Sequence, residues 1–276
     1  MSNPFLNDKA MKKAADVNTA SLATADAGWA APDLSTRATP IDDGPISTWK
    51  SGTMTVGGTI TATGVLMVIL LAAATAGWIS VDELPGGQVQ LPMLAIAGIV
   101  VGLVCAVVVA FKPNLAKILG PIYALGEGFF LGALSKGYEN YQSGIVVQAI
   151  GATLGVFVVM LVLHRTRIIK VTDRFRRTVI MATLGLAVFY LVSMVISLFG
   201  GSVSFLSSSS WLGIGFSILA AGLAALNLSL DFDFIERGSQ AGLPKNMEWY
   251  GAFGLVVTLV WLYLELLRLL SKLNQR

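Results

Sequence analysis

Seven apolar stretches, each about as long as a membrane is thick, constrain this chain more than any other feature of its sequence. The hydrocarbon core of a bilayer is roughly 30 Å thick and requires about 20 apolar residues per helix. Backbone polar groups in lipid must pair internally, and stretches that are apolar on every side favour helices over the alternating strands of a barrel. The sequence therefore predicts an all-α polytopic membrane protein, a seven-transmembrane-helix bundle, with spans at 58–79, 91–111, 118–135, 144–163, 178–199, 211–231 and 249–270.

The first 50 residues have a different composition from the rest of the chain. Whereas 55% of the whole chain is hydrophobic and only 13% is charged, residues 1–50 are rich in Ala, Asp, Thr, Ser and Lys and contain no apolar run. We expect a flexible tail over 1–50 and a membrane domain over 51–276. No apolar segment follows Met1 closely, so we expect no signal peptide, and the first span would direct insertion.

The distribution of Lys and Arg between the loops predicts the orientation. Residues 164–177 contain six basic residues and one aspartate, and 112–117 add two lysines, whereas 80–90 are acidic and 200–210 are uncharged. Basic loops face the cytoplasm. We therefore expect a cytoplasmic amino terminus. Orienting the protein is the simplest role for loop 164–177.

The carboxyl terminus fits this orientation less well. Seven crossings would place its basic residues, Arg268, Lys272 and Arg276, on the far side of the membrane. Either the terminus tolerates this position, or the last segment is re-entrant and does not cross.

Several classes of function lack support in the sequence. The formal net charge is only +3, and no nucleic-acid motif is present, so we expect no nucleic-acid partner. His164 is the only histidine, and Cys105 is the only cysteine. Sequence signatures of P-loop nucleotide binding, zinc proteolysis and serine hydrolysis are missing. We expect neither an enzyme nor a tightly bound cofactor.

Three carboxylates lie within or at the edge of predicted spans: Glu127, Asp231 and Glu265. An ionised side chain at mid-membrane costs roughly 2.5–3.5 kcal/mol on insertion scales, so such groups usually face the bundle interior or water. Together they suggest an ion site. Asp231 could instead be a boundary residue, and Glu127, between two glycines, suits a buried protonated acid as well as an ion ligand.

Two further acids and one base bear on this hypothesis. We interpret Asp233 and Glu236 as solvated loop charges, with Asp233 a secondary candidate for the ion site. Arg268 follows Glu265 by three residues, which is the spacing of an ion pair along one helix face. It is also a secondary site residue. Asp231 and Glu265 differ in depth by several turns if the hairpin is ideal, so spacing alone leaves their contact open.

Three segments resemble the Bax inhibitor-1 family, also called the transmembrane Bax inhibitor motif family: EGFFLGALS in the third span, LDFDFI in the sixth and LYLELLRLL in the seventh. A fourth segment, TMTVGGTITATG at the first span, resembles the bacterial branch of this family. The resemblance covers about residues 52–272. It implies a seven-helix bundle with the last helix central. Some members act as pH-sensitive calcium leaks, and their paired carboxylates correspond to Asp231 and Glu265.

The sequence departs from the family pattern at three places. Position 265 is Glu in place of Asp, the loop between the two acids is longer, and the second span has no acid, which makes Glu127 the candidate substitute. These departures leave the fold expectation unchanged and weaken the calcium assignment.

The resulting hypothesis is a pH-sensitive cation leak, with calcium as the transported ion and membrane lipid as its surroundings. Two carboxylates in a low-dielectric site tend to share one proton, and losing it would open the pair and offer oxygen ligands to a hard cation such as calcium. Asp231 and Glu265 would gate and bind the ion, with Glu127 contributing. The resemblance also implies an alternative, a non-transporting membrane regulator of a membrane-bound AAA protease or of a stress response. A further alternative is a proton-coupled carrier, although no polar substrate cavity is evident.

Overall fold

The computed structural model describes residues 52–82, 90, 92–199 and 208–275. The predicted tail, residues 1–50, lies outside the described residues, as do 83–89 and 200–207 of two predicted loops. Within the described part, seven helices are long and apolar enough to cross a membrane, which confirms the predicted all-α architecture. They are α2 (Val56–Ile79), α3 (Met93–Phe111), α4 (Ala116–Tyr141, preceded by the short 3₁₀ helix η3, Pro113–Leu115), α5 (Ile145–Arg165), α6 (Asp173–Leu198), α8 (Trp211–Gln240) and α9 (Met247–Asn274).

Several helices extend past the predicted spans. The sixth predicted span ends at residue 231, whereas α8 continues to Gln240, and α6 begins at Asp173, five residues before the prediction. The 30 residues of α8 rise about 45 Å, more than the hydrocarbon thickness. Its last turns therefore have room for charged residues at the membrane boundary without ending the helix.

Polar side chains satisfy the first backbone N–H groups of several helices. The hydroxyl oxygens of Thr55, Thr172 and Ser210 accept hydrogen bonds from backbone N–H groups in the first turns of α2, α6 and α8. The carboxylate of Glu139, near the end of α4, accepts from the N–H groups of Gly144 and Val146 at the start of α5. These contacts set where each helix begins.

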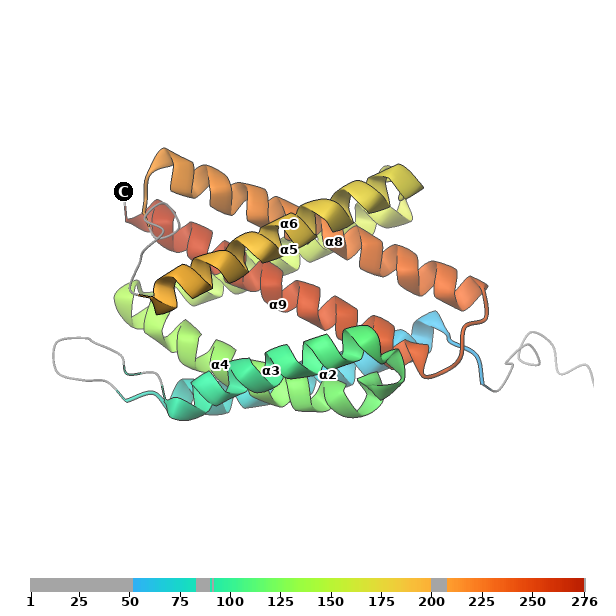
Figure 1. The fold of residues 1–276 in the computed structure, drawn as a ribbon, viewed down its shortest axis with the longest axis horizontal. Helices are drawn as coiled ribbons and strands as arrows, with labels where there is room; N and C mark the ends of the chain where they lie inside the picture. The colour runs from blue at the N-terminus through green and yellow to red at the C-terminus, as the bar shows by residue number, and fades with distance from the viewer. Residues whose placement is uncertain (1–51, 83–89, 91, 200–207, 276) are drawn as a thin grey trace, which may run out of the picture. The chain divides into compact units, whose positions relative to one another are not determined.

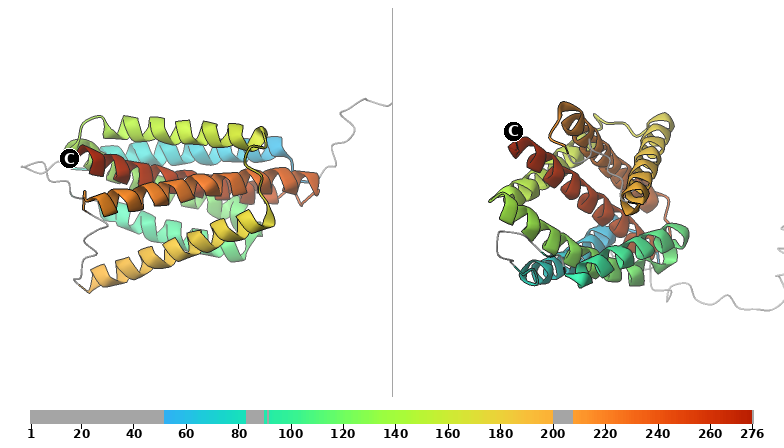
Figure 2. Two further views of the ribbon diagram at one scale, coloured as in Figure 1. Left: turned by 90° about the horizontal axis from the view of Figure 1, so that it is seen from above. Right: turned by 60° about the vertical axis from the view of Figure 1, so that its left-hand side comes forward.

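Helix α9 is the central helix of the unit formed by residues 51–276. It packs against α2, α4, α5 and α8. Figure 1 shows it running between α2, α3 and α4 on one side and α5, α6 and α8 on the other, and Figure 2 shows the same arrangement from two further directions. Helix α6 packs mainly on α8 and is inclined to it. The central position predicted for the last helix is confirmed, and its 28 unbroken residues do not support a re-entrant segment.

Glycines bring α4 very close to α2. A Cβ atom at Gly132 would lie 1.8 Å from the backbone oxygen of Ala74, and one at Gly128 would lie 2.4 Å from the backbone oxygen of Leu70. Small residues of this kind let membrane helices approach closely enough for extensive van der Waals contact. The α2–α4 interface therefore depends on these two positions.

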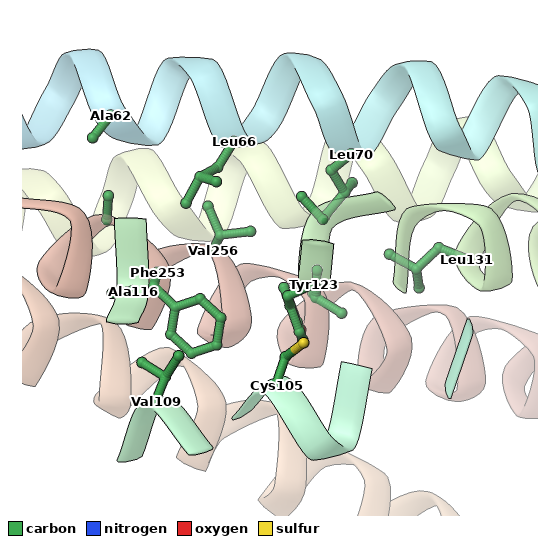
Figure 3. Close-up of a cluster of buried hydrophobic side chains, with 13 residues drawn as sticks. Ala62, Leu66, Leu70, Cys105, Val109, Ala116, Tyr123, Leu131, Phe253 and Val256 are labelled. Atoms are coloured by element: carbon green, nitrogen blue, oxygen red, sulfur yellow. The ribbon is translucent and has the colours of Figure 1, made fainter. Parts of the chain in front are cut away.

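The interior between α2, α3, α4 and α9 is filled by apolar side chains. Figure 3 shows this cluster, which includes Leu66, Leu70, Cys105, Tyr123 and Phe253. The ring of Tyr123 meets that of Phe253 edge-on, with centroids 5.0 Å apart. Cys105 is buried and free.

Candidate functional site

Helix α9 carries polar side chains along its whole length, although it is the central helix. We call these residues the α9 polar series: Glu248, Thr258, Glu265, Arg268 and Lys272. All except Arg268 are buried, and Arg268 is partly buried. Charged groups at membrane depth usually pair with one another or mark a path for ions or substrates. The α9 polar series and the acids that face it therefore define the candidate site.

Asp231 lies on α8 beside the first half of α9. Its carboxylate is next to Gly254, where a Cβ atom would lie 3.5 Å from Oδ1, and next to Thr258. Its Oδ2 atom is buried and has no hydrogen-bond partner. A carboxylate oxygen without a partner in a low-dielectric interior is costly, so this atom is the part of the site best suited to receive a proton or a cation.

Glu265 has the opposite environment, because both of its carboxylate oxygens accept hydrogen bonds. Its side chain is 2% exposed. Arg268 Nη1 lies 3.0 and 3.1 Å from its two oxygens, and the Tyr190 hydroxyl on α6 donates to Oε1 at 2.7 Å. Trp261 Nε1 adds a contact at 3.3 Å. The alternative interpretation of Glu265, an i,i+3 pair with Arg268, is present in the structure.

Asp231 and Glu265 are not in contact. Asp231 lies level with Gly254 and Thr258, and Glu265 is seven residues beyond Thr258, about 10 Å along the helix. The reason is the register of the hairpin: α8 continues to Gln240, and α9 starts at Met247, so residues equally far from this turn lie level with each other. A directly proton-sharing pair is absent from this conformation.

The interpretation of Asp233 as a solvated loop charge is wrong. Asp233 lies inside α8, is 7% exposed, and forms ion pairs with Arg176 of α6 and Arg237 of its own helix. Glu236 likewise lies inside α8 and not in a loop; its side chain is 44% exposed, and it accepts a hydrogen bond from His164 Nε2 at 3.1 Å. Arg237 follows Asp233 by four residues, so the sequence spacing predicts this ion pair, whereas the pair with Arg176 cannot be predicted in this way.

Glu127 lies on α4 and faces α3. A Cβ atom at Gly102 would lie 2.5 Å from its Oε2, so the glycine makes room for this carboxylate. Neither an ion pair nor a hydrogen bond joins Glu127 to Asp231 or Glu265 within the described residues. Its proposed role as a substitute ligand stays a prediction.

Two buried charges were not anticipated as part of the site. Lys272 donates hydrogen bonds from Nζ to the backbone oxygen of Gly213 and to Ser217 Oγ, at 3.0 and 2.9 Å. At the other end of α9, Glu248 accepts hydrogen bonds from the backbone N–H and the hydroxyl of Thr55, which begins α2. Both contacts join segments far apart in the sequence, so local spacing gives no signal for them.

The described residues do not form a closed calcium cage. Calcium takes six to eight oxygen ligands, and the described part of the chain has no cluster of three or more Asp, Glu, His or Cys side chains suited to hold a metal ion. Asp231 offers one unpaired oxygen, and Arg268 already neutralises Glu265.

Comparison with known families agrees with this architecture. No curated protein is similar enough to count as a match. A family described as Bax inhibitor 1 like matches residues 3–275, which is almost the entire chain. Together with the seven membrane-spanning helices and the central last helix, this match shows that the chain is an integral membrane protein of the Bax inhibitor 1-like family.

Proposed function

We propose that this protein is a pH-sensitive cation leak of the bacterial plasma membrane, with calcium as the main transported ion. The path would follow the α9 polar series. The protein would carry out no enzymatic reaction, and its amino terminus and its basic loops would face the cytoplasm. Membrane lipid and the transported cation would be its principal partners.

The unpaired Oδ2 atom of Asp231 is the observation that carries this proposal. A cation crossing the bundle needs an oxygen ligand that no protein donor already occupies. Asp231 of α8 supplies such an oxygen beside the first half of α9, next to the hydroxyl-bearing Thr258. Glu265 does not, because Arg268 and Tyr190 both bond its carboxylate.

The pH sensitivity would arise at Asp231 and not from a carboxylate pair. A proton and a cation would compete for the same oxygen, so acid conditions would reduce occupancy by the cation. Farther along α9, the bonded pair of Glu265 and Arg268 and the buried ammonium of Lys272 would keep the path closed. Sharing a proton between Asp231 and Glu265 would require α8 and α9 to slide by about 10 Å, which their packing opposes.

Calcium flux into proteoliposomes tests the proposal. We expect flux that rises from pH 6 to pH 8 in the wild type and a flat pH profile in Asp231→Asn, which keeps the side-chain shape. Asp173→Asn, the same change at the exposed start of α6, is the matched control and should keep the wild-type profile.

Two results would overturn the proposal. Wild-type protein that passes no cation at any pH would favour the non-transporting regulator of a membrane protease. An unchanged pH profile in Asp231→Asn would remove Asp231 from the path.

A further inference from the structure

A cavity of about 470 Å³ opens at the end of the bundle where α5, the loop before α6 and the last turns of α8 meet. It is separate from the α9 polar series. Its lining includes three full cations, Arg167, Lys170 and Arg237, as well as His164. The carboxylates of Asp233 and Glu236 also line it.

Both carboxylates in the cavity wall are already paired. Asp233 is bonded by Arg176 and by Arg237 Nε, and Glu236 is bonded by His164 Nε2. These contacts connect α8 to α6 and to α5 around the cavity. Glu236 also accepts a hydrogen bond from Gln240 Nε2 at 3.3 Å and lies 3.8 Å from Arg167 Nη2, so both carboxylates have partners in the cavity wall.

The cations have capacity left for a ligand. Arg237 is fixed by two hydrogen bonds, from Nε to Asp233 and from Nη2 to the backbone oxygen of Val171, yet 52% of its side chain is exposed. Arg167 is 80% exposed, and its contact with Glu236 is long, at 3.8 Å. Lys170 is exposed and has no ion pair within the described residues. The cavity therefore presents a positive surface around one rigidly held guanidinium.

The loop that carries Arg167 and Lys170 has a fixed backbone. The N–H of Arg167 bonds to the oxygen of His164 at 3.0 Å, and the N–H of Ile168 bonds to the oxygen of Leu163 at 3.1 Å. Arg167 has a φ of 55°, a left-handed conformation that residues with a Cβ seldom adopt. Strained backbone of this kind is often retained where it positions a functional side chain.

We propose that this cavity binds the phosphate group of an anionic phospholipid headgroup. Guanidinium and ammonium groups are the usual partners of phosphate, and basic pockets between membrane helices are suited to acidic headgroups. The location favours lipid over free phosphate, because the cavity lies at the ends of membrane-spanning helices. The neighbouring Ile168 is apolar and 69% exposed, as a residue in contact with acyl chains would be.

Binding of phosphatidylglycerol to the purified full-length chain in detergent tests this proposal. Thermal unfolding is followed while phosphatidylglycerol, phosphatidylcholine or inorganic phosphate is added. We expect a saturable rise in Tm with phosphatidylglycerol alone. The double variant Arg167→Gln/Lys170→Gln should bind it about tenfold more weakly or worse, since each basic group near a membrane surface contributes appreciably.

The matched control is Arg165→Gln/Arg174→Gln, which removes two exposed cations near the same loop that do not line the cavity. Wild-type affinity in this control supports the cavity. Equal weakening in the two double variants would overturn it in favour of a general attraction between charges. A full response to inorganic phosphate would overturn the lipid as the source of the phosphate group.

Discussion

The ion pair between Glu265 and Arg268 gives the sharpest test of how the bundle holds its buried charges. Changing Glu265→Gln removes the negative charge and leaves the shape nearly intact. Arg268 then keeps a hydrogen bond to the Tyr190 hydroxyl, at 3.0 Å, and loses the two contacts to a carboxylate. The variant therefore measures the cost of a cation without a counter-ion at this depth.

The structure sets the size of the expected loss. Removing one partner of a fully buried pair costs about 3–5 kcal/mol, because the remaining charge has no counter-ion. The Glu265 side chain is 2% exposed, but the Arg268 side chain is 36% exposed. Arg268 is therefore less completely buried than the pairs from which this cost comes. We therefore expect a loss of about 2–3 kcal/mol, which corresponds to a fall in Tm of about 4–12 °C for a unit of this size.

A double-mutant cycle in detergent isolates the pair. Unfolding free energies are compared for Glu265→Gln, Arg268→Gln and the double variant. The double variant should be more stable than the sum of the two single losses predicts, by about 1–3 kcal/mol, because it leaves no unpaired charge. Strictly additive losses, or a Glu265→Gln variant within about 0.5 kcal/mol of the wild type, would show that the pair does not hold this part of the bundle.

Three further predictions concern packing, the tail and orientation. Gly132→Ala should lower Tm strongly, since its Cβ would lie 1.8 Å from a backbone oxygen of α2. The control Gly137→Ala, whose Cβ would meet no atom within 4 Å, should leave Tm nearly unchanged. Equal effects of the two changes would contradict the packing argument. Deleting residues 1–50 should leave unfolding in detergent unchanged, and a large fall in Tm would show that the tail supports the fold. In a cysteine-free background, a cysteine at Thr166 should resist a membrane-impermeant reagent added to intact cells while one at Gln90 reacts, and the reverse pattern would invert the topology.

The sequence predicts the number and nature of the helices well because hydropathy and length are local properties. It predicts their ends poorly. Apolar content falls at Asp231, but the backbone hydrogen bonds of α8 continue to Gln240. The predicted span therefore stops nine residues early, and apolar content wrongly places Asp233 in a loop.

Contacts between residues close in the sequence can be predicted, whereas contacts between distant segments cannot. The Glu265–Arg268 pair spans three residues on one helix and could be predicted from that spacing. The contact between Asp233 and Arg176 joins residues 57 positions apart. It depends on how α6 packs on α8, which no local pattern encodes. The separation of Asp231 from Glu265 likewise depends on where the α8–α9 turn falls.

The order of charges along α9 suggests how a cation path could stay closed. Thr258 lies in the first half of α9 with Asp231 of α8 beside it, and the cations Arg268 and Lys272 lie farther along α9 toward its carboxyl end. Arg268 is neutralised by Glu265, but the ammonium of Lys272 is held by the neutral oxygens of Gly213 and Ser217. A cation at Asp231 would therefore meet a buried positive charge on this side. Because both Lys272 partners belong to the first turns of α8, an opening motion would have to displace that end of α8 from α9.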